Sequence, residues 1–165
     1  MDTKKIQELL DKNAVTILVG FPSGREHVPT LHKNKDGEYK GLNGEDPQEN
    51  AAIDTADLAR ALHFGDATTP ARPFLEDGIE SRKQEIRKAM ETEIKKQIEG
   101  SGTANWDKIG TMAVGAITEL VRSDHYKTTV PNSPKTIEYK GSDTPLIDGG
   151  DLINSLTFKV LRGTK

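Results

Sequence analysis

The sequence predicts an α+β fold in which a long helical hairpin packs on a small, mostly antiparallel sheet and a loop or hairpin projects from the domain. Strand-like runs near the two ends of the chain, at residues 14–20 and 156–160, supply the sheet. Two amphipathic helical patterns between them, at residues 75–99 and 105–123, supply the helical hairpin. The polar, turn-rich stretch at residues 21–50 has few apolar side chains to bury, so we expect it to project.

The size and charge of the chain restrict its class. With 165 residues and a mass of 18.1 kDa, we expect a single domain that spans residues 1–165. The 23 Lys and Arg residues nearly balance the 26 Asp and Glu residues, which argues against a basic nucleic-acid-binding face. The sequence has no cysteine, which excludes a disulfide scaffold and a cysteine-based metal site or nucleophile. No apolar run approaches the ~20 residues of a membrane span, so we expect no membrane partner.

The first strand follows a short amphipathic helix. Residues 3–12 place Ile6, Leu9 and Leu10 on one side of this predicted helix. The next run, Ala14–Gly20, is the most strand-like of the sequence because it is rich in β-branched residues. We expect it to pair with the strand that closes the chain.

Residues 21–50 are the predicted projection. Within them the dipeptide Asp36-Gly37 lies between two short runs and suits a tight hairpin turn. Surface loops of this length are commonly mobile or docked on a partner, and we expect this one to contact neighbouring molecules.

Two starts compete for the helix that follows the projection. Asp46-Pro47 with Glu49 has the form of a cap with proline at the first helical position. Asp54 or Thr55 is the competing start. Gly65 ends the helix in either case, and the prolines of residues 70–73 keep the next segment extended.

A single long helix is predicted from Leu75 to Glu99. Its apolar residues recur on one narrow stripe and its other faces are charged, so the stripe must anchor the helix. Gly100-Ser101-Gly102 ends it. The stripe consists of Leu75, Ile79, Ile86, Met90, Ile94 and Ile98.

A second helix, over residues 105–123, forms the hairpin with the first. Gly110 and Gly115 lie within it, and we expect another element to approach closely at both. Its apolar residues are Trp106, Ile109, Ala113, Ala116, Ile117 and Leu120.

The C-terminal stretch combines a capped helical turn with the closing strand. Asp148 is the predicted N-cap, and Asp151 adds a second carboxylate at the positive end of the helix. Ile147 and Leu152 have the spacing of a hydrophobic staple. Upstream, Ser133-Pro134 opens another short helical turn as N-cap and first helical residue. In the closing strand Leu156, Phe158 and Val160 alternate with Thr157, Lys159 and Leu161.

The polar residues do not form a recognisable active site. The four histidines, His27, His32, His63 and His125, lie in unrelated segments, and none forms the i,i+4 pair of zinc enzymes. Asp54 and Asp57 lie one helical turn apart and suggest a small metal-dependent hydrolase that uses one histidine as well. Acidic residues at a helix start explain them more simply. We therefore expect no enzyme activity, no cofactor and no resident metal.

Three segments in order along the chain carry a resemblance. The last has the pattern P-L-x-D-T-G-x-L-x-x-S-I, with glycine in place of the threonine. Before it stands Ser133-Pro134-Lys135-Thr136-Ile137, and further upstream His63-Phe64-Gly65 precedes Pro70–Leu75. Over residues 53–162 the chain thereby resembles the neck and tail-completion proteins of tailed bacteriophages. The residues that match the last pattern are Pro145, Leu146, Ile147, Asp148, Gly149, Gly150, Leu152 and Ser155.

The resemblance implies a structural role in the virion. Proteins of this kind assemble as homo-oligomeric rings, commonly sixfold, at the head–tail junction or the top of the tail. Their partners are other neck, head-completion or tail-tube proteins, and DNA passes through the ring without specific binding. Such particles are assembled in the host cytoplasm. The alternatives to this role are the metal-dependent hydrolase and a nucleic-acid-binding module.

The extended segment before the long helix is the predicted interface. Arginine and phenylalanine on a stiff segment are good interface anchors, although they also suit local packing. If they face a neighbour, charge reversal at Arg72 should impair assembly and leave the single chain folded. The interface residues of this hypothesis are Pro70, Ala71, Arg72, Pro73, Phe74 and Leu75.

Overall fold

The computed structural model describes residues 14–27 and 53–162, which adopt the predicted α+β fold. In the larger sheet, strand β1 (Val15–Gly20) pairs antiparallel with strand β4 (Thr157–Arg162). In the smaller sheet, β2 (Glu26–His27) pairs antiparallel with β3 (Ile53–Asp54). The predicted pairing of the first and last strands is thus confirmed.

The β1–β4 pairing has no break, and one face of the sheet is more buried than the other. Six consecutive residue pairs, from Val15 with Arg162 to Gly20 with Thr157, leave no room for a bulge. Side chains alternate between a half-buried face and an exposed face, as the sequence predicts for β4. Ile17 and Val160 lie on the inner face and pack against a buried cluster, whereas Leu18 lies on the outer face.

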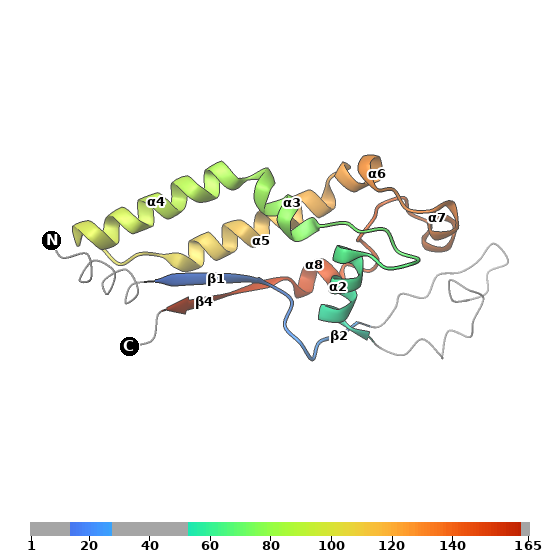
Figure 1. The fold of residues 1–165 in the computed structure, drawn as a ribbon, viewed down its shortest axis with the longest axis horizontal. Coiled ribbons are helices and arrows are strands. Elements are labelled where there is room, and N and C mark those ends of the chain that lie inside the picture. Colours follow the sequence, from blue (N-terminus) through green and yellow to red (C-terminus); the bar gives the residue numbers. More distant parts are fainter. Residues whose placement is uncertain (1–13, 28–52, 163–165) are drawn as a thin grey trace.

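The described residues form seven helices, and the long pair lies over the larger sheet. Helices α4 and α5 make the predicted hairpin, and α5 contacts both strands of the sheet, so it lies between α4 and the strands (Figure 1). None of the helices in this part of the chain is long and apolar enough to cross a membrane. The helices are α2 (Thr55–Phe64), α3 (Phe74–Ser81), α4 (Lys83–Glu99), α5 (Trp106–Arg122), α6 (His125–Thr129), α7 (Pro134–Lys140) and α8 (Asp151–Ser155).

The prediction of a single helix from Leu75 to Glu99 is wrong. Helix α3 ends at Ser81, and Arg82, with φ −123° and ψ 20°, separates it from α4. The break lets α3 pack closely on α5: a Cβ atom at Gly78 would lie 2.6 Å from the Cα atom of Ile117. Because α3 is packed against α5 in this way, α4 continues along a different axis from α3.

The predicted apolar stripe is buried only in part. Ile86 is buried, whereas Met90, Ile94 and Ile98 are 38%, 41% and 79% exposed. A step of four residues advances about 400° around a helix, so a stripe with this spacing drifts by about 40° per step. The C-terminal half of the stripe therefore turns away from α5, and the buried position there is taken by Glu93.

One of the two predicted close approaches along α5 exists. A Cβ atom at Gly110 would lie 2.1 Å from Cδ2 of Phe158, so this glycine lets β4 lie directly on the helix. The prediction for Gly115 is wrong, because a Cβ atom there would meet no described atom within 4 Å.

The helix caps confirm some predictions and correct one. Asp54 is the N-cap of α2 and accepts from the amide of Ala56, at 2.8 Å, which confirms the later of the two predicted starts. Ser133 caps α7 by accepting from Thr136, and Gly65 and Gly100 end their helices as expected. The predictions for a helix at 3–12, a turn at Asp36-Gly37, a start at Asp46 and most of the projection at 21–50 fall outside the described residues.

Asp148 is not the N-cap of α8. The cap is Gly150, with φ 90°, and the helix begins at Asp151. Gly149 is also left-handed, with φ 68°, so the two glycines carry the chain through a turn and delay the helix. Ile147 and Leu152 consequently lack the staple positions, although both pack in the same core.

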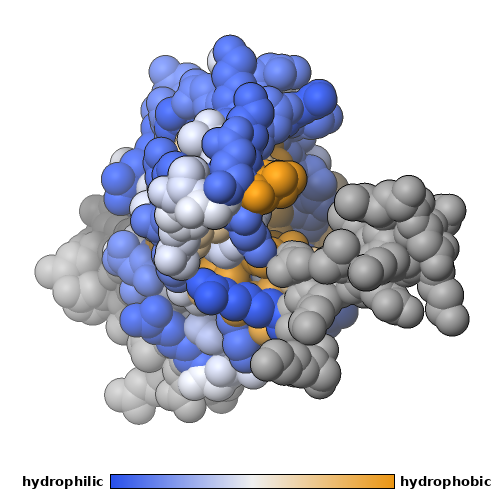
Figure 2. All heavy atoms as spheres, turned by 90° about the vertical axis from the view of Figure 1, so that its left-hand side faces the viewer, coloured by the Kyte–Doolittle hydropathy of each residue, from blue (hydrophilic) through white to orange (hydrophobic). Residues whose placement is uncertain are grey.

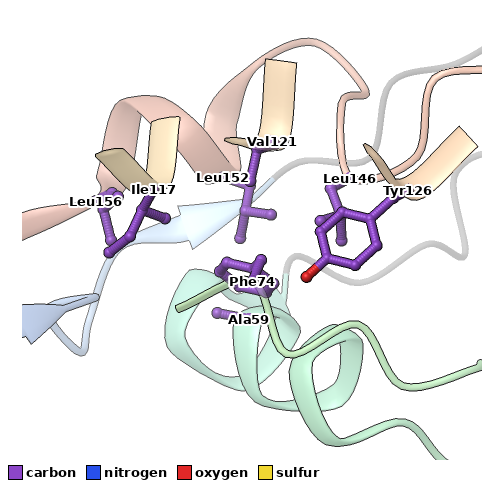
Figure 3. Packing of buried hydrophobic residues seen from close by; sticks show 8 residues of the cluster. All are labelled: Ala59, Phe74, Ile117, Val121, Tyr126, Leu146, Leu152 and Leu156. Carbon is purple, nitrogen blue, oxygen red and sulfur yellow. The ribbon is translucent and has the colours of Figure 1, made fainter. Parts of the chain in front are cut away.

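The main core lies where α2, α3, α5, α6 and the C-terminal stretch meet. Phe74 is at its centre and is 1% exposed (Figure 3). A second cluster around Trp106 and Ile109 lies between α4, α5 and the sheet. The first cluster consists of Ala59, Phe74, Ile117, Val121, Tyr126, Leu146, Leu152 and Leu156.

Candidate assembly surface

Two of the three segments that carry the resemblance pack into one unit. The extended segment donates from the amide of Arg72 to the carbonyl of Leu62 in α2, at 3.0 Å. Phe74 packs with Leu146 and Leu152 of the C-terminal pattern (Figure 3). Pro70–Leu75 and the C-terminal pattern, separated by dozens of residues in the sequence, thus share one core.

Arg72 connects this unit to the loop before α7. Its Nε donates to the carbonyl of Val130 at 2.9 Å, and its Nη2 donates to the carbonyl of Pro131 at 3.2 Å and to Oδ1 of Asn132 at 3.3 Å. The side chain is buried, and burial lowers the pKa of its guanidinium. Arg72 therefore stabilises the fold of the single chain.

This placement changes the predicted interface. Arg72 and Phe74 face inward, so they are not the exposed anchors that the hypothesis assumed. Pro70, Ala71 and Pro73 are exposed, and Leu75 is half-buried. An interface at this segment stays a prediction, with those residues as its surface. Charge reversal at Arg72 is no longer a clean test of it, because the variant would lose its buried hydrogen bonds.

The residues of the C-terminal pattern are mainly structural. Pro145, Leu146, Leu152 and Ser155 are buried, and Ile147 and Asp148 are half-buried. Leu146 has a φ of 61°, which is unusual for a residue other than glycine. Its side chain belongs to the main core, so burial offsets the cost of this backbone conformation.

Two histidines contact neighbouring carboxylates of the first turn of α3. Nε2 of the buried His63 lies 2.7 Å from Oε2 of Glu76, and Nε2 of His125 lies 3.8 Å from Oδ2 of Asp77. The hydroxyl of Tyr126 donates to the same oxygen of Asp77 at 2.7 Å. These pairs attach α2 and α6 to α3. Sequence reasoning missed them, because partners so far apart leave no local pattern.

The pair of acids in the hydrolase alternative has another role. The carboxylate of Asp54 accepts from the amides of Gly24 and Ala56, at 2.5 and 2.8 Å, and these bonds lower its pKa. Asp57 lies 3.8 Å from the guanidinium of Arg60. Across residues 14–27 and 53–162, no three His, Cys, Asp or Glu side chains gather where they would hold a metal ion.

Large apolar side chains reach the surface in separate places. Among the large apolar side chains of the described residues, Phe64, at the end of α2, is the most exposed after Ile98. Leu18 and Leu161 lie on the outer face of the β1–β4 sheet, and Met90, Ile94 and Ile98 follow one another along α4. Figure 2 views the molecule from the end where α4 meets α5 and shows hydrophobic surface between hydrophilic side chains.

The β1–β4 sheet is also hollowed at one end. A shallow depression of about 400 Å³ opens where β1 ends and β4 begins. Its lining is mostly apolar, and Lys159 is its one charged member among the described residues. The lining residues are Leu18, Val19, Gly20, Phe21, Pro22, Thr157, Phe158 and Lys159.

Comparisons of this chain with protein-family models, with curated proteins and with solved structures find no match.

Proposed function

We propose that this chain is a structural virion protein of a tailed bacteriophage, which forms a ring at the head–tail junction or at the top of the tail. The ring completes or stabilises the neck or tail and leaves a channel for DNA. The observation that carries this proposal is the core shared by the first and last segments, in which Phe74 packs with Leu146 and Leu152. Arg72 of the first segment also donates to the carbonyl of Pro131, in the loop before the middle segment. Segments that share a core depend on one another for their packing. Finding both segments in this chain therefore supports a fold shared with the neck and tail-completion proteins.

The surface of the chain is compatible with a role in assembly. Apolar side chains are exposed on α4, on α2 and on the outer face of the sheet. Such residues remain free to contact neighbours when the single chain is folded. The expected neighbours are further copies of this chain, in a ring that is commonly sixfold, and other neck, head-completion or tail-tube proteins.

The charge of the chain suits a channel that DNA passes without being held. The formal net charge is −3, with both signs interspersed. Tight binding to duplex DNA requires several cations that neutralise phosphates. A ring of near-balanced charge contacts the passing DNA weakly, so we expect no specific binding.

In-vitro complementation tests this function. Purified protein is added to DNA-filled heads and to tails from particles assembled without it, and joined virions are counted by electron microscopy. We expect the protein to restore joining, and separate incubation with each half-particle to show which one binds it. Equal joining with and without the protein would contradict a role at the junction.

A further inference from the structure

Among residues 14–27 and 53–162, no strand pairs with the outer edge of β1. Among the described residues, the sheet contains β1 and β4 alone, so each strand has one edge without a partner strand. Natural edge strands usually carry charges, prolines or bulges that prevent pairing with another chain. β1 has none of these, because Val15–Gly20 is uncharged, lacks proline and pairs through six consecutive positions. Its edge is therefore suited to accept another strand.

The same sheet offers a strand to fill that edge. In the described part of the chain β4 likewise has one edge without a partner strand, and it carries Lys159 and Arg162. Pairing β4 with β4 of a second copy would bring the cations of both copies together, which is unfavourable. Pairing β4 with the uncharged β1 avoids this repulsion. It also fills both kinds of edge, whereas pairing β1 with β1 would leave every β4 edge open.

The geometry of the sheet makes such pairing repeatable. β1 and β4 are antiparallel, so copies placed side by side give strands that alternate in direction across the contact. A contact between two different surfaces of the same chain is heterologous, and it closes into a ring when the rotation between copies permits. The sheet is held on α5 through the contact of Phe158 with Gly110, so both edges are presented by a rigid support.

We propose that β1 of one copy pairs with β4 of a second copy, so that the two-stranded sheets join edge to edge into a continuous antiparallel sheet. This inference deepens the proposed function by naming the surface through which copies of the ring contact one another. The strand pairing itself requires no other virion protein.

Sedimentation velocity of the full chain over a range of concentrations up to about 1 mM tests the association. We expect the average mass to rise with concentration. Thr16→Lys places a cation on the exposed face of β1 opposite the neutral Leu161, so the single chain should stay folded while association weakens by roughly tenfold or more. Ile98→Lys is the matched control on the exposed face of α4, and it should associate like the unmodified chain.

Cysteine cross-linking tests the identity of the paired strands, because the chain has no native cysteine. Two single variants on β1, Thr16→Cys and Leu18→Cys, are each mixed with two on β4, Thr157→Cys and Leu161→Cys. Under oxidation we expect disulfides between a β1 variant and a β4 variant in at least one mixture, and fewer in either variant alone. The two chains are distinguished by an affinity tag on one of them.

Several outcomes would overturn the proposal. One is a chain that stays monomeric at all concentrations. Another is association that is lost in Ile98→Lys and retained in Thr16→Lys, which would assign the contact to α4. Cross-links confined to single β1 variants would show a two-fold β1–β1 contact instead. If Thr16→Lys restores virion joining as well as the unmodified chain does, the strand pairing fails while the proposed function stands.

Discussion

The guanidinium of Arg72 donates to the backbone carbonyl of Val130 over 2.9 Å, and this bond joins the start of α3 to the loop between α6 and α7. Two further donations from the same side chain reach Pro131 and Asn132. We expect Arg72→Ala to lower the free energy of unfolding by about 3 kcal/mol, because it leaves buried acceptors without donors. Urea unfolding measures the change.

Two variants control this prediction. Arg72→Lys keeps the charge but lacks the planar fork of donors, so it should recover only part of the loss. Arg60→Ala removes an arginine whose side chain is 75% exposed and should change the stability by less than about 0.5 kcal/mol. A folded, fully stable Arg72→Ala chain would return this residue to the list of candidate interface anchors.

Gly110 and Gly115 of α5 form a matched pair for testing how closely the sheet packs on this helix. Alanine at Gly110 would collide with the ring of Phe158, so we expect a loss of about 1–3 kcal/mol. Alanine at Gly115 meets open space and removes a flexible residue from a helix interior, so it should stabilise the protein by up to about 1 kcal/mol. Thermal and urea unfolding of both variants give the sign of each effect.

A second substitution separates the collision from other effects of alanine. Phe158→Leu makes space beside the helix, and in that background Gly110→Ala should cost less than it does alone. Equal costs in the two backgrounds would show that Phe158 is not the residue that excludes a side chain at this position.

Glu93 predicts an acid-sensitive contribution to stability. Its carboxylate accepts from the amide of Asn105 and from Lys96, each at 2.9 Å, and these bonds lower its pKa below the ordinary value of 4.5, the backbone bond most. The stabilisation is therefore present above pH 4.5 and is lost as the pH falls through the lower pKa of the folded state. Glu93→Gln should lower the urea midpoint at pH 7, and its difference from the unmodified chain should shrink as the solution is acidified below pH 4.5.

The exposed Glu80 supplies the control for this pH dependence. It pairs with Lys83 at the surface, where an ion pair contributes little. Glu80→Gln should therefore leave the urea midpoint nearly unchanged at either pH. An equal response of the two glutamine variants would assign the acid sensitivity to general charge and not to the buried contact.

Tyr126 predicts a loss of stability in alkali. Burial raises the pKa of its phenol, and the hydrogen bond to Asp77 raises it further. The neutral phenol is thus favoured by folding, so its contribution is present below the ordinary pKa of 10.0 and is lost as the pH rises above it. We expect the unfolding midpoint to fall above pH 10 and to fall less in Tyr126→Phe. Identical alkaline profiles for the two chains would contradict this role of Tyr126.

Short-range rules predicted much of the fold. The cap at Ser133, the cap at Asp54 and the glycine ends at Gly65 and Gly100 depend on hydrogen bonds and backbone freedom within a few residues. The alternation in β4 depends on which face of a strand is buried. These features were readable in the sequence because the groups that cause them are close together along the chain.

The candidate interface was not readable in the same way. An arginine and a phenylalanine between prolines suit an exposed interface as well as a buried packing role. The positions of Val130, Pro131 and the C-terminal core decide that both side chains are buried. The burial of Glu93 was not readable in the sequence either. It depends on the amide of Asn105, which donates to the Glu93 carboxylate from another segment.

The sequence by itself determined the α+β class, the strand runs near the two ends of the chain and several helix ends, because local periodicity and capping chemistry are sufficient for them. Only the tertiary structure decided that the long helix breaks at Arg82, that α8 starts after Gly150 and that Arg72 faces inward. Those outcomes depend on which remote segments meet. Gly78 must lie against Ile117 and Arg72 must reach Val130, and no local pattern encodes such a meeting.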